Sequence, residues 1–137
     1  MRGRIGPRVI KATVFEAASG ERWKDAQCLY EAGRYQGAIY LCGYAIECQL
    51  KASVCTARGV ESLEQREAKK LGHELTHVLD AARLSRKLNE NKDLHTAFYE
   101  IANRWSTAIR YTGGGSGEWE CERFLRDSEA LLLWLKT

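Results

Sequence analysis

The sequence predicts an all-α protein, an up-and-down helical bundle, and two observations support this prediction. The 137-residue chain contains a single proline, Pro7, and after Phe15 no stretch shows the sustained apolar and polar alternation of a strand. From Gly20 onward, apolar residues instead recur at helical spacing in about five segments, separated by glycines or charged stretches. We therefore divide the chain into an N-terminal extension, residues 1–19, and one helical-bundle domain, residues 20–137.

The first two predicted helices follow each other directly along the chain. Residues from about Gly20 to Ala32 carry apolar side chains at helical spacing, and Gly33 is a natural helix end. The second helix, from about Tyr35 to Ala57, is apolar on nearly every side, which is typical of a helix buried in a bundle. Because the connection is short, we expect the two helices to pack antiparallel.

A charged connector and three further helices are predicted for the rest of the chain. The stretch from Arg58 to Gly72 is rich in charged residues and is expected to be a solvated connector with some helix. The third helix is expected from His73 to about Leu84, and the fourth carries apolar residues from Leu94 to Ile109. The glycine-rich loop Thr112 to Gly117 ends the fourth helix, and an amphipathic C-terminal helix extends from Trp119 to Leu135.

The composition is that of an ordinary soluble globular protein, with 45% apolar and 28% charged residues. No apolar run approaches the roughly 18 residues of a membrane span, and the first residues lack the apolar core of a signal peptide, so we predict a cytoplasmic protein. Five cysteines without a CxxC pair predict reduced thiols rather than a disulfide framework. The net charge of +3 permits contact with nucleic acid without arguing for it.

One polar strip interrupts the apolar surface of the second helix. At about 100° per residue, its members fall on a single narrow face. The strip consists of Tyr40, Tyr44, Glu47 and Lys51. A buried carboxylate or ammonium without a partner is too costly to keep, so another segment must supply a partner for Glu47. The candidates from later segments are His73, Arg104 and Arg110.

Two interpretations of this strip are open at this point. In the first, the strip is a buried polar network that fixes how the helices pack. In the second, the strip borders a groove that holds a phosphate or a base, because arginine offers a fork for phosphate and tyrosine a stacking face. The lining of that groove would be Tyr40, Tyr44, Lys51, Arg110 and Tyr111.

Several of these segments, taken together, resemble the HEPN family of small helical-bundle domains. The resemblance covers about Trp23 to Leu135 and rests on EAGRY before the second helix, GAIYLCGYAIECQLKA along it, GHEL before the next helix and WSTAIRY before the glycine loop. It implies an up-and-down bundle that commonly forms homodimers. Some members of this family are metal-independent ribonucleases, often toxins, and others lack the catalytic residues and accompany a nucleotidyltransferase or bind nucleotide.

The ribonuclease branch of this family uses an arginine followed a few residues later by a histidine. Arg104 stands at a plausible arginine position, but the positions where the histidine would fall hold Ile109, Arg110 and Tyr111. Arginine cannot transfer a proton near neutral pH. We therefore predict a module without catalysis or a cofactor, which binds nucleotide or RNA or engages a partner in a nucleotidyltransferase or toxin–antitoxin system. The alternative is a ribonuclease with a divergent site, in which His73 replaces the missing histidine.

A third possibility is zinc hydrolysis, because His73, Glu74 and His77 match the HExxH pattern. In that pattern two histidines one helical turn apart hold the metal, and the glutamate activates water. Asp80 and Arg83, however, stand where the extended pattern needs glycine and histidine.

Glycines and tryptophans give two further expectations. Gly37 and Gly43 each cost the second helix about 1 kcal/mol relative to alanine, so we expect another backbone to approach closely there. The large aromatic residues at apolar helical positions are expected to anchor the core or a dimer interface. They are Trp105, Trp119 and Trp134.

Overall fold

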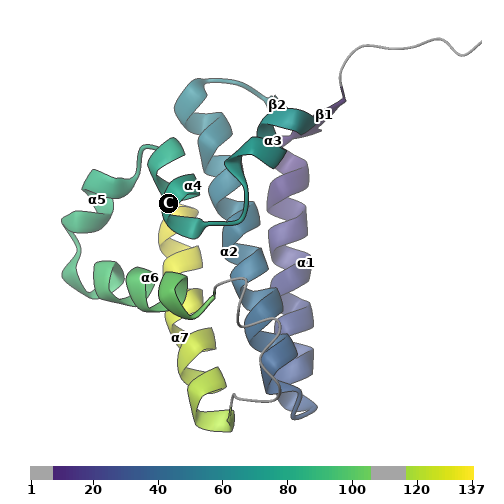
Figure 1. Ribbon diagram of the computed structural model, residues 1–137, viewed down its shortest axis with the longest axis vertical. Helices are drawn as coiled ribbons and strands as arrows, with labels where there is room; N and C mark the ends of the chain where they lie inside the picture. The colour runs from purple at the N-terminus through teal and green to yellow at the C-terminus, as the bar shows by residue number, and fades with distance from the viewer. Residues whose placement is uncertain (1–7, 106–116) are drawn as a thin grey trace, which may run out of the picture.

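Three long helices form the body of the molecule (Figure 1). The computed structural model describes residues 8–105 and 117–137. The long helices are α1 (Ala12–Glu31), α2 (Tyr35–Arg58) and α7 (Glu118–Leu135). Helices α1 and α2 are antiparallel, and α7 runs along α2 in the same direction as α2 (Figure 1). The prediction of an all-α helical bundle is confirmed.

Shorter elements connect the long helices. Helix α6 crosses α7, and a two-stranded antiparallel sheet lies near one end of α1, with α3 beside it (Figure 1). In chain order these elements are β1 (Val9–Lys11), β2 (Ser62–Glu64), α3 (Gln65–Leu71), α4 (Leu75–Ala81), α5 (Ser85–Asn89) and α6 (Lys92–Arg104).

The hairpin of α1 and α2 forms where the sequence predicts it. Gly33 adopts a φ of 77°, in the left-handed region that glycine enters without steric cost, and it separates the two helices. Helix α1 nevertheless begins at Ala12, so residue 20, the predicted start of the bundle, lies within it. The earlier start has a packing reason, because Phe15 is buried and the Ser19 hydroxyl donates to the Ala45 carbonyl at 2.8 Å.

Strand β2 corrects the expectation that no strand follows Phe15. A three-residue strand is too short to show alternation in a sequence. It forms because Leu63 is buried opposite Ile10 in the sheet. Directly after it, Glu64 and Glu67 form a capping box that starts α3, each side chain accepting a hydrogen bond from the other residue's backbone N–H.

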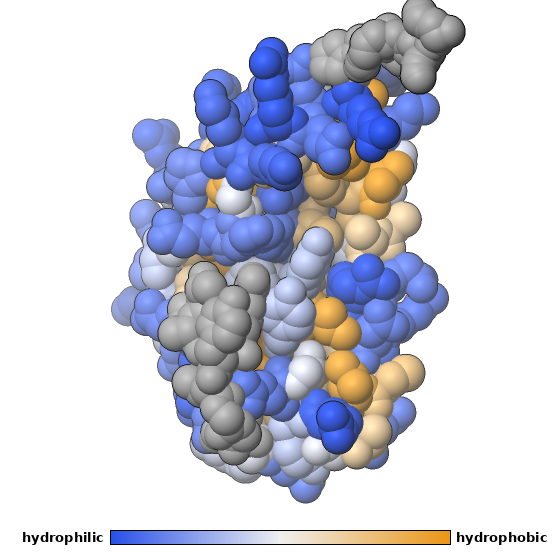
Figure 2. Space-filling view, turned by 45° about the vertical axis from the view of Figure 1, so that its right-hand side comes forward, coloured by the Kyte–Doolittle hydropathy of each residue, from blue (hydrophilic) through white to orange (hydrophobic). Residues whose placement is uncertain are grey.

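The core surrounds α2, whose apolar side chains contact α1, α4 and α7. On the face drawn in Figure 2, hydrophilic residues cover most of the surface and apolar side chains emerge as smaller patches between them. Trp105 is buried and Trp134 half-buried, as expected, but Trp119 is 70% exposed. Trp119 lies in the first turn of α7, where it borders a largely polar cleft and does not enter the core.

Side chains, not a second backbone, approach the two glycines of α2, which corrects the sequence expectation. A Cβ atom at Gly43 would lie 2.3 Å from the indole of Trp105. A Cβ atom at Gly37 would lie 3.3 Å from the Leu29 side chain. The indole of Trp105 therefore requires a glycine at position 43, while the contact at position 37 is much less severe.

The five cysteines are free thiols, and all but Cys28 are buried. Burial raises the pKa of Cys42 to about 12 and that of Cys48 and Cys121 to about 11. These side chains therefore act as small apolar packing residues. Within residues 8–105 and 117–137, no helix is both long enough and apolar enough to cross a membrane.

Candidate functional site

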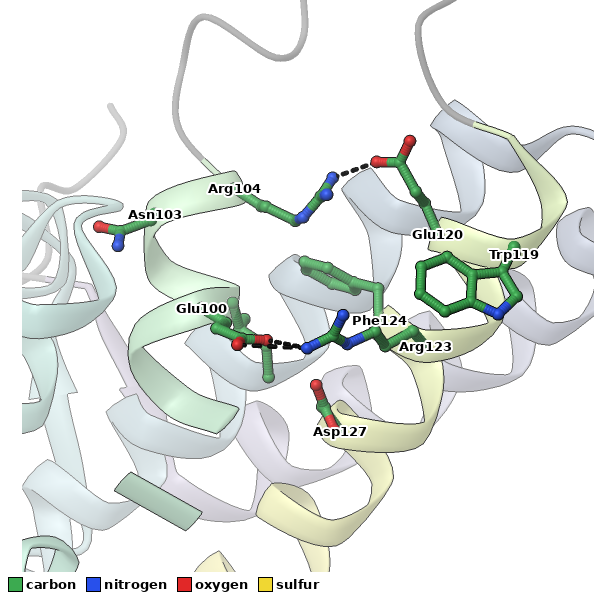
Figure 3. Close-up of a pocket in the computed structure, with 9 residues that line it drawn as sticks. Glu100, Asn103, Arg104, Trp119, Glu120, Arg123, Phe124 and Asp127 are labelled. Atoms are coloured by element: carbon green, nitrogen blue, oxygen red, sulfur yellow. Dashed lines mark hydrogen bonds and ion pairs between the residues drawn. The ribbon is translucent and has the colours of Figure 1, made fainter. Parts of the chain in front are cut away.

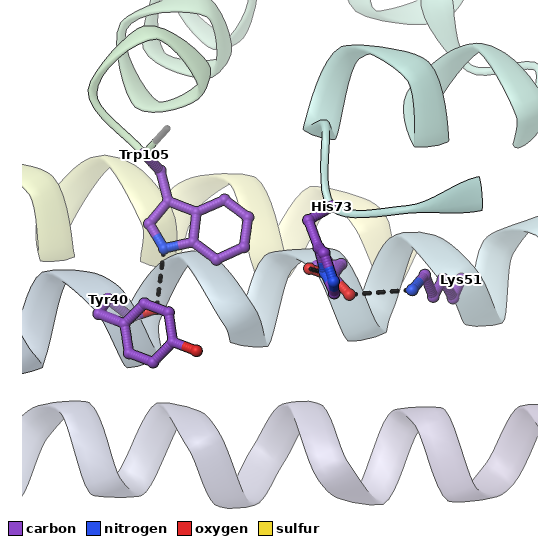
Figure 4. Close-up of polar contacts among 5 residues, drawn as sticks. Tyr40, Lys51, His73 and Trp105 are labelled. Carbon is purple, nitrogen blue, oxygen red and sulfur yellow. Dashed lines mark hydrogen bonds and ion pairs between the residues drawn. The ribbon is translucent and has the colours of Figure 1, made fainter. Parts of the chain in front are cut away.

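A polar cluster joins α2 to the segment that precedes α4 (Figure 4). It consists of Glu47 and Lys51 from α2 and His73 from that segment. The Lys51 ammonium lies 2.9 Å from one oxygen of Glu47, and the Nδ1 atom of His73 lies 2.9 Å from the other. Glu47 is only 2% exposed and Lys51 7% exposed. Of the two candidate partners for Glu47 that the structure describes, His73 and Arg104, His73 is the one that meets it.

The turn at Gly72 brings His73 to this position. Gly72 ends α3 with a φ of 72°, and His73 follows it before α4 begins at Leu75. The His73 side chain is 60% exposed even though one of its nitrogens contacts the buried carboxylate. Since Lys51 already neutralises Glu47, the imidazole is not needed for charge balance. With Nδ1 at Glu47, the Nε2 nitrogen is the one left for a ligand.

A groove of about 780 Å³ opens beside His73, between the α3–α4 segment and the end of α6. Its volume lies within the range of about 300 to 1,000 Å³ that is typical of ligand pockets. Polar groups from several segments converge on it. They include Lys70, His73, Glu74, Thr76, His77 and Asn103. The groove therefore offers cationic, imidazole and amide groups at one place.

The indole of Trp105 closes one side of this groove and is itself firmly held. Its Nε1–H donates to the Tyr40 carbonyl at 2.9 Å, and its ring stacks on the Tyr40 ring with 6.3 Å between centroids. Gly43 leaves the space that the indole fills. Figure 4 shows that Trp105 and His73 reach α2 from the same side.

The remaining sequence candidates occupy different places. Tyr44 packs edge-to-face on Tyr40, and burial, with smaller effects of Cys48 and Glu47, raises its pKa. Arg104 forms an ion pair with Glu120 in a separate cleft between α6 and α7, so it does not meet Glu47. The last two candidates, Arg110 and Tyr111, lie outside the described residues.

The HExxH pattern does not form the helical arrangement that a zinc hydrolase uses. Helix α4 begins at Leu75, whereas the third helix was predicted to start at His73, so only His77 of the two histidines is helical. His73 instead contacts the carboxylate of Glu47. In the part of the chain that the structure describes, no three His, Cys, Asp or Glu side chains are grouped so that they could hold a metal ion.

Sequence reasoning missed the contribution of Lys70 and Asn103 to the groove. Lys70 belongs to α3, which the sequence analysis treated as part of a solvated connector, and Asn103 lies in the last turn of α6. Gly72 was the signal in the sequence that could have indicated this contribution of Lys70. It permits the turn that places Lys70 and His73 at one groove.

Comparisons with known proteins agree with this architecture. The family model described as the HEPN domain matches residues 17–137. A crystal structure described as an archaeal HEPN homologue superposes with a TM-score of 0.64 at 15% sequence identity, covering 93% of this chain and 96% of that one. No curated protein sequence matches the chain. At this identity the structural match establishes the fold.

Proposed function

The chain belongs to the HEPN domain family, and we propose that it binds a nucleotide or the nucleotide units of RNA in the groove beside His73. The observation that carries this proposal is the position of His73, held by a buried carboxylate at Nδ1 while most of its side chain remains exposed in a groove. An imidazole fixed in this way is pre-organised, so less conformational entropy is lost when it contacts a ligand.

The chemistry of the groove fits a nucleotide. Lys70, His73 and His77 offer donors for phosphate oxygens, and Thr76 and Asn103 offer hydrogen bonds to a sugar or a base. Trp105 also lines the groove, although it is only 5% exposed, so it contributes a small apolar part of the wall. Glu74 opposes anions in the same groove, which favours a ligand that also presents hydrogen-bond donors, such as a ribose or a base, over a bare phosphate.

Fluorescence anisotropy with a labelled single-stranded RNA, together with calorimetry using adenosine monophosphate, tests this proposal. We expect Lys70→Ala to weaken binding about tenfold, which corresponds to 1.4 kcal/mol. Lys69→Ala is the matched control, because it removes the same charge from the neighbouring position, which does not line the groove. Equal effects of the two variants, or the absence of binding to both probes, would contradict the proposal.

A ribonuclease with a divergent site is the second candidate, and the Glu47–His73 contact favours it. A carboxylate that holds one imidazole nitrogen can orient the other nitrogen for proton transfer. Incubation with single-stranded RNA and a chelator tests this function. Cleavage that His73→Gln abolishes and His95→Gln preserves would establish it, and intact RNA would exclude it. Arg104→Ala should have no effect, because Arg104 lies in the other cleft.

Family membership also motivates a proposal about partners. The protein would act as a homodimer, with a nucleotidyltransferase as companion in a toxin–antitoxin-type system. Sedimentation velocity of the purified protein tests the first part. A single species at the mass of one chain, 15.5 kDa, across the micromolar range would exclude the homodimer.

A further inference from the structure

A second cleft, separate from the proposed nucleotide groove, lies between α6 and α7 (Figure 3). It has a volume of about 300 Å³, and the buried side chain of Phe124 contributes to its lining. Two ion pairs join its walls, one between Arg104 and Glu120 and one between Arg123 and Glu100 at 3.1 Å. This volume is at the small end of ligand pockets, so it suits side chains of a partner better than a whole nucleotide.

Among the described residues that line the cleft, acids outnumber bases by one. Its two arginines are paired with Glu120 and Glu100, and the third acid, Asp127, makes no hydrogen bond or ion pair within residues 8–105 and 117–137. Figure 3 shows the Asp127 carboxylate next to the Arg123–Glu100 pair. Burial, and then the nearby charge of Glu100, raises the pKa of Asp127, and the charges of Arg123 and Arg126 oppose this shift to a smaller extent. An added cation would counter the effect of Glu100.

Trp119 provides a large apolar surface at the other end of the same cleft. The residue is 70% exposed, and the Arg123 guanidinium lies 5.8 Å from the centre of its ring. Tryptophan is among the residues enriched at the positions that carry most of the binding energy of protein interfaces. Trp119 and Asp127 are two turns apart on α7, about 12 Å along the helix axis, with Arg123 between them.

We propose that this cleft binds an extended segment of a partner protein that carries a basic side chain and, two positions away, an apolar side chain. The basic group meets Asp127 and the apolar group packs on Trp119. In an extended chain, alternate residues are about 7 Å apart and point to the same face. The lengths of the basic and the apolar side chain make up the rest of the roughly 12 Å between the helix positions of Trp119 and Asp127. The excess of acids disfavours RNA here, because phosphates would meet Asp127 and Glu120. This proposal does not rest on the nucleotide groove, although Asn103 contributes to the lining of both clefts.

Two short peptides, acetyl-Phe-Gly-Arg-amide and acetyl-Arg-Gly-Phe-amide, test this inference in an NMR titration of the full chain. We expect one of them to shift the Trp119 indole signal in a saturable way. The same peptides with citrulline, an uncharged analogue of arginine, should bind about two- to fivefold more weakly, as expected for the loss of one partly screened ion pair. Equal binding of the citrulline peptides, or no shift with either arginine peptide, would overturn the proposal.

Matched variants separate the two contacts. Asp127→Asn should weaken binding of the arginine peptide about two- to fivefold, whereas Glu129→Gln, a change of the same kind on α7 outside the cleft, should not. Calorimetry should show that Trp119→Ala weakens binding and that Leu133→Ala, which removes another exposed apolar side chain of α7, leaves it unchanged. Unchanged amide spectra away from the cleft establish that each variant is folded. Binding that survives Asp127→Asn and Trp119→Ala in folded proteins would overturn the proposal.

Discussion

At the scale of single residues, the Glu47 carboxylate shows how a buried charge is made tolerable. Each of its two oxygens has one cationic or imidazole partner at 2.9 Å. The same pairing makes the cluster sensitive to partial removal, because one unpaired charge in an apolar environment costs more than the loss of the whole pair.

The first prediction concerns this pair. Glu47→Leu leaves the nearly buried Lys51 ammonium without a carboxylate and should lower the free energy of unfolding by about 3 kcal/mol or more. Adding Lys51→Met to Glu47→Leu should restore part of the loss, because the remaining charge is then removed. Urea unfolding of the single and double variants measures both effects. A double variant as unstable as the sum of the two single variants would contradict this description.

Gly43 and Gly37 give a matched pair of glycines in one helix. Gly43→Ala places a methyl group 2.3 Å from the Trp105 indole, and the resulting overpacking should destabilise the protein by about 1 to 3 kcal/mol. Gly37→Ala gains helix propensity of up to about 1 kcal/mol and meets only the end of a leucine side chain. Thermal unfolding should therefore separate the two variants, and comparable losses in both would be inconsistent with the structure.

The buried thiols predict a dependence on alkaline pH. Since the folded-state pKa of Cys42, Cys48 and Cys121 is above the ordinary value of 9.0, the stability they contribute is fully present below about pH 9. It is lost as the pH rises through the folded values of about 11 and 12. The free energy of unfolding should fall above pH 9, and less steeply in Cys42→Ala. In native protein at pH 8, iodoacetamide should modify Cys28 alone, so labelling of all five thiols would contradict their burial.

At the scale of elements, helix α3 determines where the groove residues Lys70 and His73 lie. It precedes the Gly72 turn and contributes Lys70, so its N-terminal capping box helps to position the groove. Glu67 also pairs with Arg58 at the end of α2, which ties α3 to the main bundle.

We predict that Glu67→Ala destabilises α3 by about 1 kcal/mol, because it removes one half of the capping box. Hydrogen exchange should then accelerate for the amides of residues 65–71. Glu61→Ala serves as the control, since Glu61 is exposed and lies just before β2. If exchange in α3 were equally fast in both variants, the capping box would not be what stabilises this helix.

Long periodic elements could be predicted from the sequence, and short ones could not. The apolar surface of α2 indicates a long buried helix, and Gly33 and Gly59 lie just outside its two ends. Strand β2 and helix α5 are too short to show a period, and tertiary packing of Leu63 and Leu88 decides them. The sequence also required a partner for Glu47, but the choice of His73 over Arg104 depends on the turn at Gly72 and on the Glu120 side chain.

At the scale of the whole molecule, α6 separates two clefts of different character. The groove beside His73 presents Lys70 and two histidines, whereas the α6–α7 cleft has an excess of acids. Asn103, in the last turn of α6, contributes to the lining of both. The different side chains of the two clefts suit them to different ligands, a nucleotide in the groove beside His73 and a basic protein segment in the α6–α7 cleft.

The most direct test of the nucleotide-binding proposal is an NMR titration that follows the imidazole signals of the three histidines while adenosine monophosphate is added. His73 and His77 line the groove, whereas His95 lies in α6 with its ring 4.7 Å from that of Tyr99 and serves as an internal control. The proposal predicts saturable shifts for His73 and His77 and an unchanged signal for His95. Unchanged signals for His73 and His77 at saturating nucleotide, or an equal shift of all three, would contradict it.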